Sequence, residues 1–168
     1  IKTCATGGVL SEGAAVGVEQ YSYDELKVMV DEAAKAKRKV AAHAHGTEGI
    51  KVAVRAGVSS IEHGSFLDEE GARLMAERGV YLVPTLMAGE TVELAASGGR
   101  LTGLRAEKAR AAATAMRNAI KLAVRVGVPV AFGSDAGVGD HGASAREFDL
   151  LVEWGGLTPL AAITTAQS

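Results

Sequence analysis

The stretch Lys39-Val-Ala-Ala-His-Ala-His-Gly46 decides the fold, because an apolar run of strand length ends there in two histidines and a glycine. Side chains alternate along a strand, so His43 and His45 share one face. In α/β proteins, ligands and catalytic groups gather where parallel strands end. The stretch therefore predicts a buried strand with a polar site at its carboxyl end.

Two later segments repeat this design. Ser59-Ser-Ile-Glu-His-Gly64 ends an apolar run on His63, and Val130-Ala-Phe-Gly-Ser-Asp135 ends another run on a carboxylate. Imidazole nitrogen and carboxylate oxygen are good ligands for zinc and similar divalent ions. A lone histidine beyond a strand is more often a core or loop residue than a ligand. Three such strand ends in one chain reverse that preference and predict a metal site.

A βα repeat connects these strand ends, because short apolar runs alternate with segments of helical periodicity. The spacing suits parallel strands joined by crossover helices. The expected strands cover 1–5, 39–43, 59–63, 80–83 and 128–132, and the expected helices cover 23–37, 47–56, 68–78, 105–126, 144–154 and 158–166. Glycines interrupt the pattern between Leu86 and Leu104, which predicts a mobile excursion with one short helix near 90–96 and a lid over the site.

Composition describes one globular unit. The 168 residues are 48% hydrophobic, enough to bury the core of one domain. The formal charge of −2 gives no electrostatic reason to expect nucleic acid or an anionic membrane as a partner. A single cysteine excludes an internal disulfide, and neither a signal peptide nor an apolar span of bilayer length is recognisable. The expected location is the cytoplasm.

Four motifs together resemble the metal-dependent amidohydrolase superfamily, especially its Xaa-Pro dipeptidase (prolidase-like) and imidazolonepropionase-related branch. They stand in the family's order: Ile1-Lys-Thr-Cys-Ala-Thr-Gly-Gly8, Val40-Ala-Ala-His-Ala-His-Gly46, Ser60-Ile-Glu-His-Gly64 and Phe132-Gly-Ser-Asp-Ala-Gly137. The resemblance implies an α/β fold, a (β/α)8 TIM barrel with two metal ions, usually zinc. A whole barrel takes about 250 residues. Residues 1–168 would therefore be the C-terminal part of the barrel domain, strands 4 to 8, with strands 1 to 3 and their His-x-His pair absent.

The resemblance also implies metal ligands in this chain: Lys2, His43, His63 and Asp135. Lys2 would have to be carboxylated, because a free ammonium has no lone pair to donate, and its carbamate would bridge the two zinc ions. A metal-activated hydroxide would attack the scissile carbonyl. Asp135 would be the catalytic proton shuttle, carrying a proton from the attacking water to the leaving nitrogen.

Three further residues are candidates for substrate binding. His45 shares a face with His43, but the family pattern gives the metal to the first histidine of that strand end. His45 is therefore assigned to substrate contact or to a position behind the ligands, with ordinary hydrogen bonding as the alternative. His141 and Tyr21 are assigned to substrate contact, with loop capping and helix-start packing as their respective alternatives.

The implied function is metal-dependent hydrolysis of an amide or peptide bond in a small peptide or N-acyl amino acid. The chain begins at Ile1 without methionine and would leave open sheet edges, so activity is expected only with the missing N-terminal barrel segment. One alternative is a noncatalytic fragment or a self-associating module that forms a homo-oligomer. A deaminase or cyclic amidohydrolase is another, although Gly46 stands where a deaminase has an acid three residues after His43.

Overall fold

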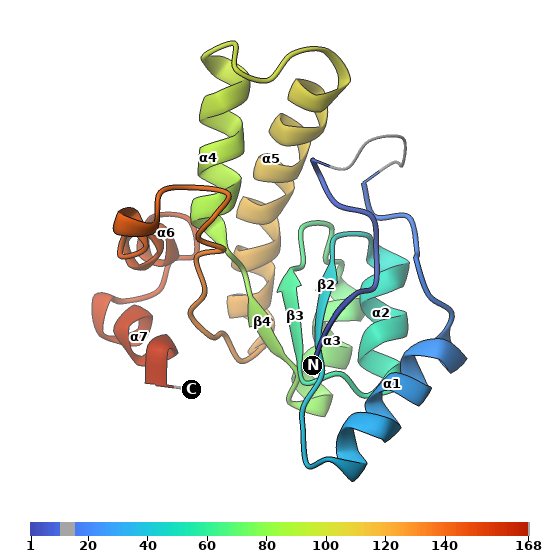
Figure 1. The fold of residues 1–168 in the computed structure, drawn as a ribbon. Helices are drawn as coiled ribbons and strands as arrows, with labels where there is room; N and C mark the ends of the chain where they lie inside the picture. The colour runs from blue at the N-terminus through green and yellow to red at the C-terminus, as the bar shows by residue number, and fades with distance from the viewer. Residues whose placement is uncertain (11–15, 168) are drawn as a thin grey trace.

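The computed structural model describes residues 1–10 and 16–167 as an α/β fold built on a parallel sheet (Figure 1). Its four strands lie side by side in chain order: β1 (Lys2–Cys4), β2 (Ala41–Ala44), β3 (Ser60–His63) and β4 (Tyr81–Val83). The register aligns Cys4 with His43, and His43 with Glu62. The predicted parallel βα repeat is therefore confirmed. Part of the loop expected before Tyr21 lies outside the described residues.

The fifth expected strand, 128–132, is reduced to a short stretch of pairing with β4. The Leu82 N–H donates to the Pro129 carbonyl (2.8 Å), and the Ala131 N–H donates to the Leu82 carbonyl (2.9 Å). Pro129 has no N–H of its own to donate. The Phe132 N–H turns away to the Thr165 carbonyl (3.0 Å). The sheet thus continues in the expected direction, but this segment forms only an isolated parallel β-bridge, between Leu82 and Val130, and not a full strand.

Helices α1 (Tyr23–Lys35), α2 (Thr47–Ala56) and α3 (Glu69–Arg78) form the crossovers between successive strands. The middle helix, α2, lies against β2 and β3, with α1 and α3 as its neighbours (Figure 1). Ser22 and Glu25 form the capping box that the sequence predicts at the start of α1. The strand side chains that pack in the core under these helices are fully buried; they include Ala42, Ala44, Ile61 and Leu82.

The helix predicted near 90–96 is present but spans 86–97, so an irregular excursion is wrong for that stretch and correct only for the turn at 98–102. Helix α4 (Leu86–Ser97) runs beside α5 (Gly103–Val126), and this helical hairpin extends well beyond the sheet (Figure 1). Gly89 allows the close contact between them, because a Cβ there would lie 2.9 Å from the Met116 sulfur. The glycine that suggested an irregular loop is therefore a packing residue.

The chain ends in helices α6 (Arg146–Glu153) and α7 (Pro159–Thr164), with 3-10 turns at His141–Ala143 and Thr165–Gln167. Helix α6 contacts both α4 and α7, and so ties the end of the chain to the hairpin. None of the helices described here combines the length and apolarity needed to cross a bilayer.

Gly46 lies between β2 and α2, where the backbone at Gly17 comes so close that no side chain fits. Its φ is −74°, which any residue can adopt, but a Cβ there would lie 2.2 Å from the Gly17 carbonyl oxygen. We predict that Gly46→Ala lowers the free energy of unfolding by about 1–3 kcal/mol, because backbone must move to relieve the overlap. Denaturant unfolding measures this change.

Gly142→Ala is the matched control, because the nearest atom to its Cβ would be 3.8 Å away. Its free energy of unfolding should stay within about 1 kcal/mol of the parent value. Equal denaturant midpoints of unfolding for Gly46→Ala and Gly142→Ala would contradict the steric explanation for Gly46.

Candidate metal centre

Three imidazoles meet at the carboxyl ends of β2 and β3. The ring centroids of His43 and His63 are 4.6 Å apart, those of His43 and His45 are 4.7 Å apart, and those of His45 and His63 are 4.8 Å apart. Their potential ligand nitrogens all lie within 4.8 Å of one another. We call His43, His45 and His63 the histidine cluster. The structure thus places His45 beside the two predicted histidine ligands.

His63 reaches this cluster through an unusual backbone conformation. Strand alternation alone would group His63 with the buried Ile61, but its φ of 71° is left-handed. Thr85 and Asp135 are also left-handed, with φ values of 49° and 52°. Such conformations cost about 1–3 kcal/mol each in residues other than glycine and gather at functional sites. The pattern of hydrophobic residues in the sequence does not predict these left-handed conformations.

Hydroxyl groups hold the two buried rings of the cluster. His45 Nδ1 lies 2.7 Å from Ser65 Oγ, and His63 Nδ1 lies 2.6 Å from Thr85 Oγ1. Both contacts engage Nδ1, so Nε2 is the ring nitrogen that does not face these hydroxyls. Hydrogen-bond partners of this kind orient histidine ligands in metal sites. The sequence analysis missed Ser65 and Thr85, whose only signal is a hydroxyl residue two positions after a strand end.

Burial favours the uncharged form of all three imidazoles. Burial lowers the pKa of His45 to about 3, with a smaller contribution from His43. Burial, followed by repulsion from the other two imidazoles and Lys2, lowers the pKa of His63 to about 2. The pKa of His43 is also lowered by burial and by Lys2, while the Asp135 carboxylate acts in the opposite direction. Neutral imidazoles keep the lone pairs that a divalent cation needs.

The histidine cluster, Lys2 and Asp135 line one cavity of about 360 Å³. Lys2 is half exposed, and its Nζ lies 3.8 Å from Glu62 Oε2. All four predicted metal ligands thus line the same cavity, and two of them, His43 and His63, belong to the histidine cluster. The wall contributed by the helical hairpin is apolar and includes Ala88, Val92, Ala112 and Met116.

Two predicted substrate contacts lie away from this cavity. Tyr21 is half-buried and packs against the main hydrophobic core. His141 is exposed in a 3-10 turn, where its carbonyl accepts a hydrogen bond from Ser144 Oγ (3.3 Å). Neither side chain lines the cavity, so the structure does not bring them to the histidine cluster.

Comparison with known proteins identifies the family. The sequence profile described as "Amidohydrolase family" matches residues 1–166. The chain belongs to the amidohydrolase family. Ochratoxinase from Aspergillus niger is 42% identical to this amidohydrolase chain over 166 residues, which cover 99% of the chain and 34% of ochratoxinase.

Solved amidohydrolase structures share the fold closely. A Xaa-Pro dipeptidase with methionine bound in its active site superposes with a TM-score of 0.93 at 40% identity, covering 98% of this chain and 41% of the dipeptidase. The A. niger ochratoxinase structure gives a TM-score of 0.88 at 42% identity, covering 99% of this chain and 37% of ochratoxinase. A prolidase complexed with N-methylphosphonate-L-proline gives a TM-score of 0.87 at 35% identity. The match covers 97% of this chain and 40% of the prolidase. The chain thus spans about two fifths or less of these relatives, and the predicted partial barrel is confirmed.

The depressed histidine pKa values predict acid sensitivity of the metal-free protein. The ordinary pKa of histidine is about 6.5, whereas burial lowers the pKa of His45 to about 3 and that of His63 to about 2. The unfolded state therefore binds more protons below pH 6.5, so stability is full above that value and is lost as pH falls toward 3. We expect His45→Asn to reduce this loss between pH 7 and 4.5 by about 1–3 kcal/mol.

Urea unfolding at several pH values measures the effect. His141→Asn is the control, because His141 is exposed and lies outside the cavity. An identical pH dependence in the two variants would show that burial of His45 does not cause the acid sensitivity.

Proposed function

We propose that this chain forms part of the active site of a metal-dependent amidohydrolase that cleaves an amide or peptide bond. The observation that supports it most is the histidine cluster, which lines one cavity together with Asp135. The dipeptidase and ochratoxinase relatives favour a small substrate with a carboxylate next to the scissile bond, such as a dipeptide or an N-acyl amino acid.

The residues present suit a divalent ion, and we propose zinc. His43 and His63 would bind it through imidazole nitrogen and Asp135 through a carboxylate oxygen, which are ligand types that zinc prefers. Lys2 would join them only after carboxylation, which replaces its ammonium with an anionic carbamate. The bound metal would supply Lewis acidity, which makes a water molecule more acidic. The complete site would hold two ions.

Asp135 has the position and chemistry for proton transfer. Its carboxylate lines the cavity beside the histidine cluster, where it would accept a proton from the attacking water and deliver it to the leaving nitrogen. His45 would contact the substrate or support the neighbouring ligands. The apolar wall of the hairpin opposite would limit access of bulk water, which strengthens electrostatic interactions in the site.

The remaining barrel strands would complete this site. Pairing in the described sheet ends at β1 on one side and at residues 129–131 on the other. We infer that residues 1–168 act as one unit of a barrel domain whose N-terminal segment pairs with these edges. Hydrolysis is therefore expected from the complete protein.

Asp135→Asn tests the proton shuttle. Asparagine tolerates the left-handed backbone of this position better than most residues, so the fold should persist. We expect kcat for dipeptide hydrolysis to fall by a factor of about 100 or more, the usual contribution of a general acid–base group. The thermal midpoint should move by only a few degrees. Retained turnover in the folded variant would refute the assigned role.

Metal removal tests the centre itself. Dialysis against a chelator should abolish hydrolysis by the complete protein, and zinc should restore it. His63→Asn should lower the bound zinc per chain, whereas His141→Asn should leave it unchanged, because His141 lies outside the cavity. Less than one tightly bound metal per chain in the parent, together with no hydrolysis, would instead favour a noncatalytic module.

A further inference from the structure

We propose that Glu147 is a positioning residue for His63, acting through the first turn of α4 and the Thr85 hydroxyl. The inference rests on the proposed function, in which His63 is a metal ligand. No part of the family resemblance assigns a role to Glu147, which lies in α6, outside the cavity that holds the histidine cluster.

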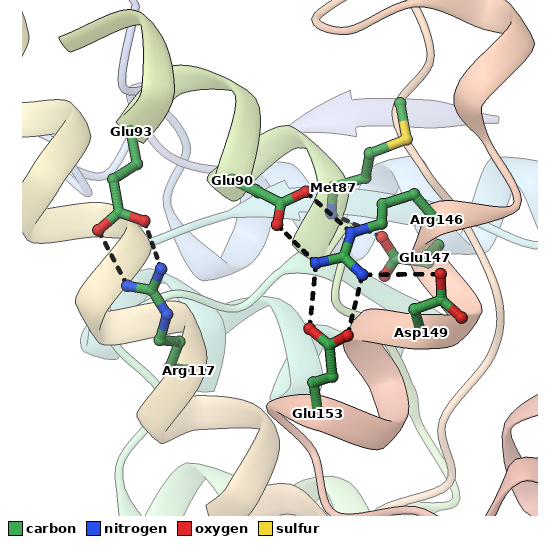
Figure 2. Close-up of polar contacts among 8 residues, drawn as sticks. All are labelled: Met87, Glu90, Glu93, Arg117, Arg146, Glu147, Asp149 and Glu153. Carbon is green, nitrogen blue, oxygen red and sulfur yellow. Dashed lines mark hydrogen bonds and ion pairs between the residues drawn. The ribbon is translucent and has the colours of Figure 1, made fainter. Parts of the chain in front are cut away.

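The Glu147 side chain is fully buried against the beginning of α4. Its carboxylate accepts hydrogen bonds from the backbone N–H groups of Leu86 (2.9 Å) and Met87 (2.7 Å). Figure 2 shows the glutamate beneath the helix start, beside Met87. The first N–H groups of a helix have no partner within the helix and usually bond to the side chain of the residue that precedes it. Here a residue from a distant helix supplies that cap.

Thr85 stands in the capping position but uses its hydroxyl elsewhere. It makes no side-chain hydrogen bond to α4, and its backbone is left-handed (φ 49°, ψ 47°) instead of extended. Its Oγ1 lies 2.6 Å from His63 Nδ1. Because Glu147 caps the helix, the Thr85 hydroxyl is free to hold the imidazole. A β-branched residue rarely adopts this backbone, so its surroundings must maintain it.

Glu147 is an ionisable residue in a fully buried position. Burial raises the pKa of its carboxyl to about 7, and the two backbone donors only partly offset that effect. A buried carboxylate is costly compared with an apolar side chain of similar size. The site therefore keeps an acid where packing alone would favour a hydrophobic residue, and what that acid contacts is the turn that contains Thr85.

Other polar contacts hold α4 farther along the helix and provide matched controls. Arg146 forms a two-pronged pair with Glu90 (2.9 and 3.2 Å), and Arg117 pairs with Glu93 (Figure 2). Arg146 also binds Glu153. Removing Glu90 should therefore loosen the same two helices, α4 and α6, without freeing the first turn of α4.

The test compares variants of the complete protein at pH 8, where the Glu147 carboxylate is ionised. Glu147→Gln turns an amide N–H toward a backbone N–H, and Thr85→Val removes the hydroxyl while keeping the shape. We expect each to weaken zinc binding by about 10-fold or more, as loss of a histidine-orienting partner usually does. Thr85→Ser and Glu90→Gln should stay within about threefold of the parent. Competition with a chromophoric chelator measures these affinities.

Two further readouts separate positioning from general stability. Nitrogen-15 NMR of the metal-free protein should show the His63 proton on Nδ1 in the parent and Glu90→Gln, and a mixture of tautomers in Glu147→Gln and Thr85→Val. The double variant Glu147→Gln/Thr85→Val should bind zinc no more weakly than Thr85→Val alone, because both residues act along one path.

Parent-like zinc affinity and tautomer in Glu147→Gln would overturn the proposal, as would equal weakening by Glu90→Gln. If Glu147→Gln does not fold, Glu147→Asp replaces it, since the shorter carboxylate cannot reach both N–H groups and should shift affinity in the same direction. If the parent itself binds no zinc, the proposed function fails. The tautomer of metal-free His63 in Glu147→Gln then decides the positioning role alone.

Discussion

The left-handed turn at His63 is the constraint on which the candidate centre depends. It ends β3 and directs the imidazole toward His43 instead of leaving it among the helix-facing side chains. Thr85, two residues after β4, and Asp135, beyond the short pairing at 129–131, are also left-handed. The strain at these positions must be offset by the surrounding fold, which includes the sheet, the buried hydroxyl contacts and the capping of α4.

The helical hairpin connects the stability of the fold to the shape of the site. Helices α4 and α5 bury a small core of their own between Val92, Ala96, Ala106 and Ala109, and Val92 also lines the cavity, together with Ala88, Ala112 and Met116. Salt bridges join this hairpin within itself and to α6 (Figure 2). A substitution in the hairpin core can therefore alter the cavity wall without touching any metal-ligand candidate.

Local patterns predicted much of this arrangement. Alternation and the spacing of the apolar runs predict the parallel strands and single out His43, His63 and Asp135, whereas Lys2, the first residue of β1, follows only from the family resemblance. All four line the cavity. Gly89 misled because glycine favours both loops and close helix contacts, whereas Gly98 and Gly99 do lie in a turn. Ser65, Thr85 and Glu147 were missed because their roles depend on distant partners; Glu147 caps a helix that begins about sixty residues earlier in the chain. His141 and Tyr21 were chosen by proximity along the chain, which does not determine where a side chain points.

The docking of α6 against α4 has a consequence for biosynthesis. A ribosome completes the histidine cluster long before it adds Glu147, and domains acquire their tertiary contacts as the chain emerges. On the proposed path, the orientation of His63 is completed only after the C-terminal helices have packed.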